Sequence, residues 1–489
     1  MLQFLIILLF ISFFFSVFQI FQIGTYGVTP TDLILLLFFL YILKKVIWDG
    51  VEVKIVKEVT FLFVFLLIVS MLFSGIVPLI NGEPEQIIQY IKSSIHFLYL
   101  VSFAFVCILY PISAKIWKNA IRTWLILGLI VNIFGIYQIF ARAYDLPLAW
   151  LKFTNVSLTL RGSYDIEDYT QLSLSFGNFY RATSIFHEPS ALAGFNIYII
   201  IFLLIPYIQR TKQFFRSKVF NFLMFVVSII TLFLTFSLTG LLGLLVILGA
   251  IILIEKKKRI KRLAIIVFSG ITFLIIADII AEKYFEISVM ELFQQRVSSI
   301  ISHKAPDAVT IVGESFITRL ESADKTIKIW RESPFLGVGL GLTAYQKKYE
   351  IHFSDYTFLS ALAEMGILGG LAILGLFFSL LITTLKLYKR NNQEEKITGD
   401  QKLLLGIILY LAIFQIILNF VTSNLLINFV LWLTLGMIFS IISDIKLKTE
   451  GEAYIISLFQ NPLKIQLKTA LAYIKANSKL IRTRKSKIL

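Results

Sequence analysis

The chain has 489 residues, of which 57% are hydrophobic and 16% are charged, and its formal net charge is +16. Repeated apolar runs approach or exceed the ~18 residues that identify a transmembrane helix, which excludes an ordinary soluble domain. Because the basic residues lie in the connectors between these runs, the positive charge indicates membrane topology rather than nucleic-acid binding. The single cysteine, Cys107, excludes a disulfide framework and a cysteine-ligated metal site.

The apolar runs predict an all-α polytopic membrane protein with about twelve transmembrane helices. The first run lacks a basic n-region and a small-residue cleavage pattern, so we expect a retained helix rather than a signal peptide. The division of residues 219–254 into two spans depends only on the short sequence Ser237-Leu238-Thr239-Gly240. The expected spans are residues 2–23, 29–47, 59–80, 87–110, 116–141, 190–208, 219–237, 239–254, 263–280, 356–386, 402–419 and 424–443.

Lysine and arginine gather in every second connector between the expected spans, which is the positive-inside pattern. We therefore expect both termini in the cytoplasm, two large loops on the outer face, and the basic tail on the anionic inner leaflet. The resulting organisation is helices one to five (1–141), a first external loop (142–189), helices six to nine (190–280), a second external loop (281–355), helices ten to twelve (356–443) and a cytoplasmic tail (444–489).

The first external loop carries aromatic residues among acids, a mixture that suits sugar recognition but also occurs at ordinary membrane interfaces. It ends in RATSIFHEPS at residues 181–190. Pro189 and Glu188 suit the start of the next helix. Capping does not explain Arg181 and His187, a cation and a titratable group that could hold an anion at this helix N-terminus.

Lys92 lies one helical turn before His96 in the expected span 87–110. One interpretation is a snorkelling lysine beside a hydrogen-bonded core histidine. The other is an additional cation for a phosphate-binding cavity, and the sequence leaves both open.

The second external loop ends in RLESADKTIKIWRESPFLGVGLG at residues 319–341. Apolar residues at three- and four-residue spacing predict an amphipathic helix on the outer membrane surface, which ends before Pro334. Arg319 and Trp330 lie nearly on one face of this helix, whereas Arg331 is rotated away. The glycines that follow predict a tight turn back into the bilayer.

The next span carries a carboxylate, Glu364, within DYTFLSALAEMGILGG at residues 355–370. An acid in a membrane helix is costly, so it indicates either a functional site or a protonated, hydrogen-bonded group that fixes helix packing. External arginines can bind phosphate oxygens without a metal, and a carboxylate or histidine can accept a proton from an attacking sugar hydroxyl. We therefore expect no metal and no cofactor.

These segments together resemble the O-antigen polymerase and ligase superfamily. RATSIFHEPSALAGF resembles its Arg-x-x-Ser/Gly-x-Phe-x-Glu-Pro signature, and the segments 319–341 and 355–370 resemble its C-terminal signature. That signature is an Arg-led helix ending in Pro-x-x-Gly-x-Gly, followed by a helix with Leu-x-x-x-x-Glu-x-Gly. The resemblance implies a multispanning, metal-independent inverting glycosyltransferase of the GT-C type. Its donor and acceptor would be undecaprenyl-diphosphate-linked oligosaccharides on the outer face of the bacterial cytoplasmic membrane.

The resemblance implies a diphosphate-binding site rich in arginine. Arg181 and Arg319 match the arginines expected to engage the diphosphate, and Arg331 is a second candidate nearby. Lys92 and Trp330 complete the expected binding residues.

The resemblance also implies acidic catalytic positions, which Glu188 and Glu364 match. Ligase-like members often carry a histidine nine residues before the helix glutamate, where this chain has Asp355, with His352 three residues earlier. This departure favours a polymerase, with Asp355 as the candidate base and His187 as the second candidate.

Two alternatives share many of these features. Within the family, the glycan could be transferred to a lipid or protein acceptor, as in a ligase. From another class, twelve spans also suit a flippase or transporter of lipid-linked sugars, although transporters usually place polar groups at the bilayer midplane. The partners expected are the bilayer, the lipid-linked donor and acceptor, a chain-length regulator and a flippase, and no nucleic acid.

Overall fold

The computed structural model describes the chain from residue 1 to residue 457, with gaps. The residues outside the description are 24–25, 51, 56–57, 156–170, 172, 174, 177–178, 286–287, 289, 292–293, 295–313, 344–355, 392–396, 422–425, 427, 450–453 and 458–489.

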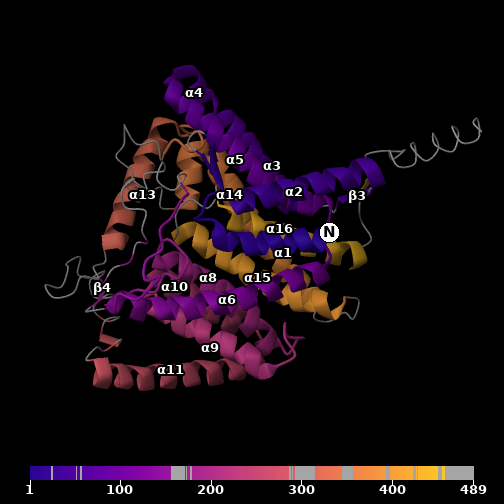
Figure 1. Cartoon of the computed structure of the whole chain (residues 1–489). Helices are drawn as coiled ribbons and strands as arrows, with labels where there is room; N and C mark the ends of the chain where they lie inside the picture. The colour runs from indigo at the N-terminus through magenta and orange to yellow at the C-terminus, as the bar shows by residue number, and fades with distance from the viewer. Residues whose placement is uncertain are drawn as a thin grey trace, which may run out of the picture.

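Helices dominate this part of the chain, and each expected span contains one (Figure 1). Three short antiparallel strand pairs accompany them: β1 (Phe21–Ile23) with β2 (Tyr26–Val28), β3 (Glu52–Ile55) with β6 (Tyr454–Ser457), and β4 (Ser175–Phe176) with β5 (Phe179–Tyr180). The helices are α1 (Leu2–Ser12), η1 (Phe13–Phe15), α2 (Pro30–Lys44), η2 (Lys45–Asp49), α3 (Val59–Ser74), α4 (Ile76–Asn81), α5 (Pro84–Leu109), α6 (Ala114–Ala143), α8 (Pro189–Gln209), α9 (Lys218–Leu234), α10 (Leu238–Ile254), α11 (Lys257–Phe285), α13 (Glu314–Glu332), α14 (Thr357–Asn391), α15 (Gly399–Val421) and α16 (Phe429–Thr449).

The chain is an all-α polytopic membrane protein. Among the described residues, seven helical segments are long and apolar enough to cross a membrane: α3 with α4, α5, α6, α8, α14, α15 and α16. The segments Leu2–Phe15, α9 and α10 are apolar but shorter than these. The total of twelve spans therefore stays a prediction.

The division of residues 219–254 into two helices is confirmed. Phe236 adopts a positive φ of 47° between α9 and α10, which interrupts the helix. Ser237 then caps α10, because its side chain accepts a hydrogen bond from the backbone N–H of Gly240 at 3.4 Å. A break of three residues, Thr235–Ser237, separates the two apolar helices, and it begins two residues before the start of the expected separator Ser237–Gly240.

The most buried helices are α8, α15 and α16, which lie in the centre of the molecule in Figure 1. About four-fifths of the most apolar part of each is buried, consistent with sequences that are apolar on all sides. Around this centre, α14 packs against α3 and α15, and α5 packs against α16. The helix α13 packs on α14 at the end of the bundle that also carries β4.

The basic connectors meet at one end of the bundle. Lys118, near the start of α6, forms an ion pair of 2.6 Å with Asp400 at the start of α15. Arg122 donates a hydrogen bond to the carbonyl of Phe214 between α8 and α9. Glu58 before α3 forms an ion pair with Lys446 near the end of α16. These contacts agree with the common side predicted from the alternating positive charge.

The expected cytoplasmic tail begins with ordered structure. The helix α16 continues to Thr449, six residues past the expected end of the last span at residue 443. Residues 454–457 then form β6, which pairs with β3 in the basic connector before α3. Backbone pairing between two connectors was not visible in the sequence, because strand partners this far apart share no local pattern.

Candidate functional site

The glycine-rich segment after α13 docks onto a break in α14. Gly366 has φ 66° and ψ −169°, which interrupts the helix and leaves preceding carbonyls without their helical partners. Backbone N–H groups of the turn replace those partners: Val338 donates to Ala363 at 2.9 Å and Gly339 donates to Glu364 at 3.0 Å. The N–H of Ile367 donates in return to the carbonyl of Pro334 at 2.9 Å.

Glycine is required at this junction for both conformation and space. Gly337, Gly339 and Gly341 have φ of 77°, 110° and 79°, in the left-handed region that favours glycine. A Cβ at Gly337 would clash with the backbone of Glu364, and a Cβ at Gly366 would clash with the Phe335 carbonyl. The predicted tight turn is therefore confirmed. Its glycines allow its backbone to come into contact with the backbone of α14.

The carboxylate of Glu364 is buried directly beneath this turn. Its side chain is about 1% exposed, and one oxygen accepts a short hydrogen bond from the hydroxyl of Thr343, the last described residue after the glycines. The broken helix and the docked turn thus hold the acid in one position. Burial and this hydrogen bond agree with a glutamate that fixes helix packing, and its catalytic role stays a prediction.

The helix α13 confirms the predicted amphipathic element and its end before Pro334. The sequence analysis placed its apolar face on the membrane surface and did not predict that the helix packs on α14. Ser322, Thr326 and Ile329 are buried, whereas Trp330 is only half-buried. Small hydroxyl side chains allow two helices to approach closely, so packing on α14 selects a neighbouring face.

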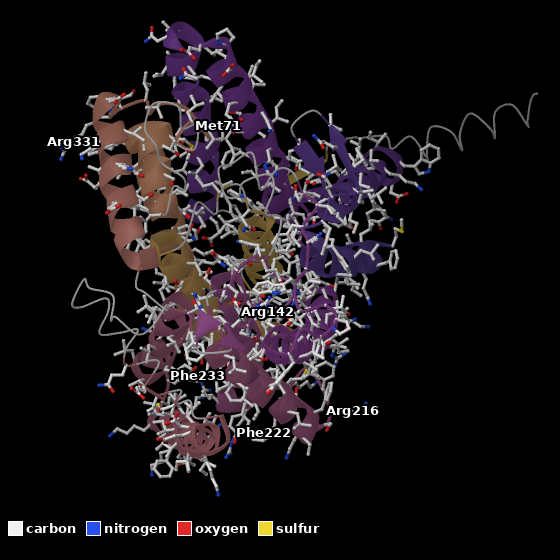
Figure 2. The ribbon with its side chains drawn as sticks, turned by 60° about the vertical axis from the view of Figure 1, so that its left-hand side comes forward. Met71, Arg142, Arg216, Phe222, Phe233 and Arg331 are labelled. Carbon is white, nitrogen blue, oxygen red and sulfur yellow. The ribbon has the colours of Figure 1, made fainter. Side chains whose placement is uncertain are left out.

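Three predicted binding residues belong to α13, and the structure describes two of their side chains. The indole N–H of Trp330 donates to the carbonyl of Pro334 at 3.1 Å, which fixes the start of the glycine turn. Arg331 is exposed, and Figure 2 shows it on the outer side of α13. Arg319 lies in the helix, while its side chain lies outside the described part.

Lys92 lies on α5, beside the glycine turn. Its neighbour Ser93 fills the space that a Cβ at Gly341 would need, and Gln89 donates a hydrogen bond of 3.3 Å to the Ser93 hydroxyl. Lys92 itself is half-buried. The turn therefore contacts the part of α5 that carries Lys92.

Arg181, His187 and Glu188 form a second group at the start of α8. Arg181 is buried, and its Nε donates to the carbonyl of Thr235 at 2.8 Å. Nε2 of His187 lies 3.8 Å from Glu188 Oε1, and the hydroxyl of Ser190 donates to the same oxygen. Pro189 begins α8, as predicted, with Glu188 at the N-cap.

The sequence analysis missed Arg142, which binds described residues at both ends of the segment between α6 and α8. It is 4% exposed and donates to the carbonyls of Ala149 and Arg181, each at 2.9 Å. It also donates to the side chain of Gln171 at 2.7 Å and lies 4.2 Å from the centre of the Trp150 ring. An arginine at the end of an apolar run was the available signal, but it equally suits an interfacial anchor.

The described contacts define two groups of predicted residues. One joins Glu364 to the glycine turn and, through α13, to Trp330 and Arg331; the other joins His187 to Glu188 and places Arg181 against α9. Glu364 lies about two turns into α14, and His187 and Glu188 directly precede α8; both helices pack against α15. Asp355 and His352 lie outside the described residues, so the identity of the base stays a prediction.

The fold and this site define a multi-pass membrane protein with a carboxylate buried at one end of a helical bundle. Residues 223–374, about a third of the chain, match the family model described as O-antigen ligase, and this match supports a relation to the O-antigen ligase and polymerase superfamily. The matched region contains α13, the glycine turn, Glu364 and Gly366, and it excludes Arg181, His187 and Lys92. The match supports membrane-bound glycan transfer of the ligase and polymerase type. No curated protein matches the chain.

Proposed function

We propose that the chain is a polysaccharide polymerase, a glycosyltransferase that joins undecaprenyl-diphosphate-linked oligosaccharides on the outer face of the cytoplasmic membrane. A hydroxyl oxygen of the acceptor sugar attacks the anomeric carbon of the donor from the face opposite the diphosphate. The C–O bond to the diphosphate breaks with inversion, undecaprenyl diphosphate leaves, and a base takes the hydroxyl proton. Both termini lie in the cytoplasm, and the bundle is of the GT-C type with twelve spans.

The observation that carries the proposal is the buried Glu364 in the region that matches the family. A carboxylate fixed by Thr343 and by the docked turn can orient an acceptor hydroxyl or a neighbouring group without reorganisation. Asp355, nine residues earlier, is the proposed base, and His187 is the second candidate. Glu188 would hold His187 in place across their 3.8 Å contact.

The proposed diphosphate site uses the external cations. Arginine keeps its charge and binds phosphate oxygens in bidentate fashion, so it stabilises the departing diphosphate without a metal. Arg181 and Arg319 would make these contacts, with Arg331 and Lys92 adding positive charge and Trp330 holding the turn.

The test is complementation in cells that lack the gene, with polymer length scored on a glycan gel and membrane-level expression checked for each variant. We expect Arg181→Ala, Arg319→Ala and Glu364→Gln to leave single lipid-linked units. Lys328→Ala, an exposed cation on α13, is the matched control and should make a full ladder. Full ladders from both arginine variants would remove the diphosphate site from the mechanism.

A ligase is the second candidate, because the matched family model carries that description. Purified protein with lipid-linked oligosaccharide as the only substrate separates the two. A polymerase makes a ladder from this substrate alone, whereas a ligase requires a separate lipid or protein acceptor. Accumulation of lipid-linked units facing the cytoplasm in cells without the protein would instead support the flippase alternative.

A further inference from the structure

A cavity of about 210 Å³ lies at the opposite end of the bundle from the proposed active site. It is lined by the last residue of α8, the connector that follows, and the facing ends of α11, α14 and α15. The 21 residues of α8 separate its lining from Glu188 by roughly 30 Å at the usual helical rise. The lining residues are Gln209, Arg210, Thr211, Lys212, Arg259, Tyr388, Gly399, Lys402 and Leu405.

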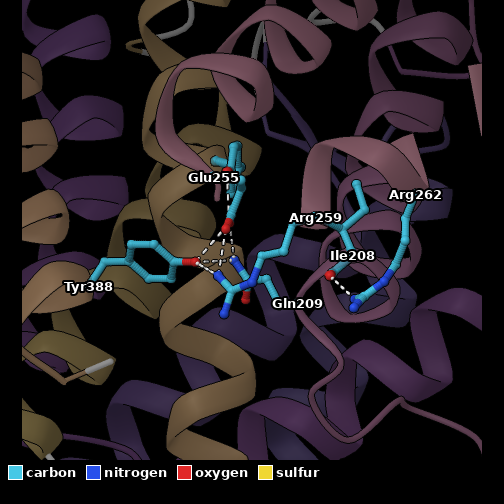
Figure 3. A network of polar contacts seen from close by, with 7 residues as sticks. Ile208, Gln209, Glu255, Arg259, Arg262 and Tyr388 are labelled. Carbon is cyan, nitrogen blue, oxygen red and sulfur yellow. Dashed lines mark hydrogen bonds and ion pairs between the residues drawn. The ribbon is translucent and has the colours of Figure 1, made fainter. Parts of the chain in front are cut away.

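A hydrogen-bonded network fixes one wall of this cavity (Figure 3). Glu255, which follows α10, accepts hydrogen bonds from Gln209 at 2.8 Å, Tyr388 at 2.7 Å and Tyr410 at 3.1 Å on one oxygen. Arg259 forms an ion pair with the other oxygen and donates to the Tyr388 hydroxyl at 2.7 Å. The network holds α8, α10, α11, α14 and α15 together and orients the Arg259 guanidinium.

The electrostatic balance of the cavity favours an anion. Its described lining includes four cationic side chains and no carboxylate. Of these, Arg259 is neutralised by Glu255, while in the described part of the chain no ion pair joins Arg210, Lys212 or Lys402 to an acid. The nearby Asp400 is already bound by Lys118.

The placement of Lys212 adds a second, independent indication. Its ammonium nitrogen lies 3.5 Å from the point that a Cβ of Gly399 would occupy, so a cation rests on the first residue of the 23-residue helix α15. The N-terminus of a helix carries a partial positive charge and binds anions through its free N–H groups. Thr398 caps the backbone N–H of Gln401, and Asp400 in the first turn is paired with Lys118. An additional anion would therefore lie between Lys212 and the remaining N–H groups at the start of α15.

We infer that this cavity is a phosphate-binding site, separate from the proposed active site, in which Arg210, Lys212, Lys402 and the start of α15 surround one phosphate group. The cavity is open to solvent on the side of Arg210, Lys212 and Lys402, which are exposed, and it has room for a phosphate together with a small polar substituent. Two sources carry this chemistry: the headgroup of an anionic phospholipid and a soluble phosphate. The site lies where membrane-spanning helices end and basic connectors gather, which is the depth of lipid headgroups. Bound there, the phosphate would link α8, α14 and α15.

The experiment uses the purified full chain in mild detergent and measures binding directly, without reference to activity. One arm titrates phosphatidylglycerol, with phosphatidylcholine as the uncharged comparison, and counts bound lipids by native mass spectrometry. The other arm titrates inorganic phosphate by calorimetry. The variant is Lys212→Gln with Lys402→Gln, and the matched control is Lys115→Gln with Lys257→Gln, two exposed lysines at the same end that do not line the cavity.

We expect a phosphate probe to bind the wild type and the control equally, and to bind the variant at least tenfold more weakly, since each charge-assisted contact is worth roughly a factor of ten. Selective retention of phosphatidylglycerol identifies a lipid headgroup, and saturable binding of inorganic phosphate identifies a soluble ligand. Equal affinities in variant and control, or binding of neither probe to the wild type, would overturn the inference. The proposed glycan transfer stands or fails separately, because its site lies at the other end of α8.

Discussion

Replacement of Gly366 by alanine tests whether the non-helical conformation of this residue allows the glycine turn to bind α14. The native φ and ψ of 66° and −169° belong to a region that only glycine adopts without strain. Alanine would add about 1–3 kcal/mol of strain there and would drive its Cβ into the Phe335 carbonyl. Separation of the turn would also weaken the three backbone hydrogen bonds between the turn and α14, each worth about 1 kcal/mol.

Together these effects predict that docking of the turn weakens by roughly 2–4 kcal/mol. Hydrogen exchange is the direct assay, because the amides of Val338, Gly339 and Ile367 are protected only by this docking. They should exchange roughly 30- to 1,000-fold faster in Gly366→Ala, as the free energy converts into an opening equilibrium. Glycan transfer should fall as well, because Glu364 loses the contact that positions it.

The control for this experiment is Gly249→Ala in α10, where an added Cβ meets no atom within 4 Å. A helical glycine with open space tolerates alanine, so the exchange and the melting temperature should match the wild type or improve. If Gly366→Ala kept wild-type exchange at the three amides, the strained junction would not support the turn and the account of Glu364 would be wrong.

Three further predictions follow from individual contacts. Thr343→Val removes the hydroxyl that binds Glu364, so in a double-mutant cycle with Glu364→Gln on glycan-transfer rate the two losses should be clearly non-additive; additive losses would mean that the two side chains act independently. Arg142→Gln removes the cation that holds the first external loop, so limited proteolysis should cut between residues 144 and 188 at least tenfold faster, whereas unchanged cleavage would show that the loop is held elsewhere. Burial alone would raise the pKa of Glu255, but hydrogen bonds from Arg259, Tyr388 and Gln209 outweigh it and the pKa lies below its usual value. The stability contributed by ionised Glu255 is therefore present above the ordinary glutamate pKa of about 4.3, and it is lost as the pH falls through the lowered pKa. The melting temperature of Glu255→Gln should therefore lie well below that of the wild type at pH 7. At strongly acidic pH the two melting temperatures should approach each other.

The helical content and the common side of the basic connectors could be predicted from the sequence because both depend on local composition. The length of an apolar run determines whether its transfer to lipid is favourable. The lysine and arginine content of a connector indicates on which side of the membrane it stays. The start of α8 at Pro189 and the end of α13 before Pro334 were equally local, since proline restricts its own φ and the conformation of its neighbour. The existence of a break between α9 and α10 was also predicted, although it was expected at Ser237–Gly240 and lies at Thr235–Ser237.

Contacts between distant segments could not be predicted in this way. The sequence marked Glu364 and the glycines as unusual, but only the tertiary structure showed that the glycines approach the backbone of α14 at Gly366. Arg142 looked like an interfacial anchor, and the Glu255 network joins five helices without any sequence motif. Composition fixes which segments enter the membrane, because each residue meets lipid or water on its own. The position of a buried charge depends on partners that the chain brings from far away, and only the folded bundle supplies them.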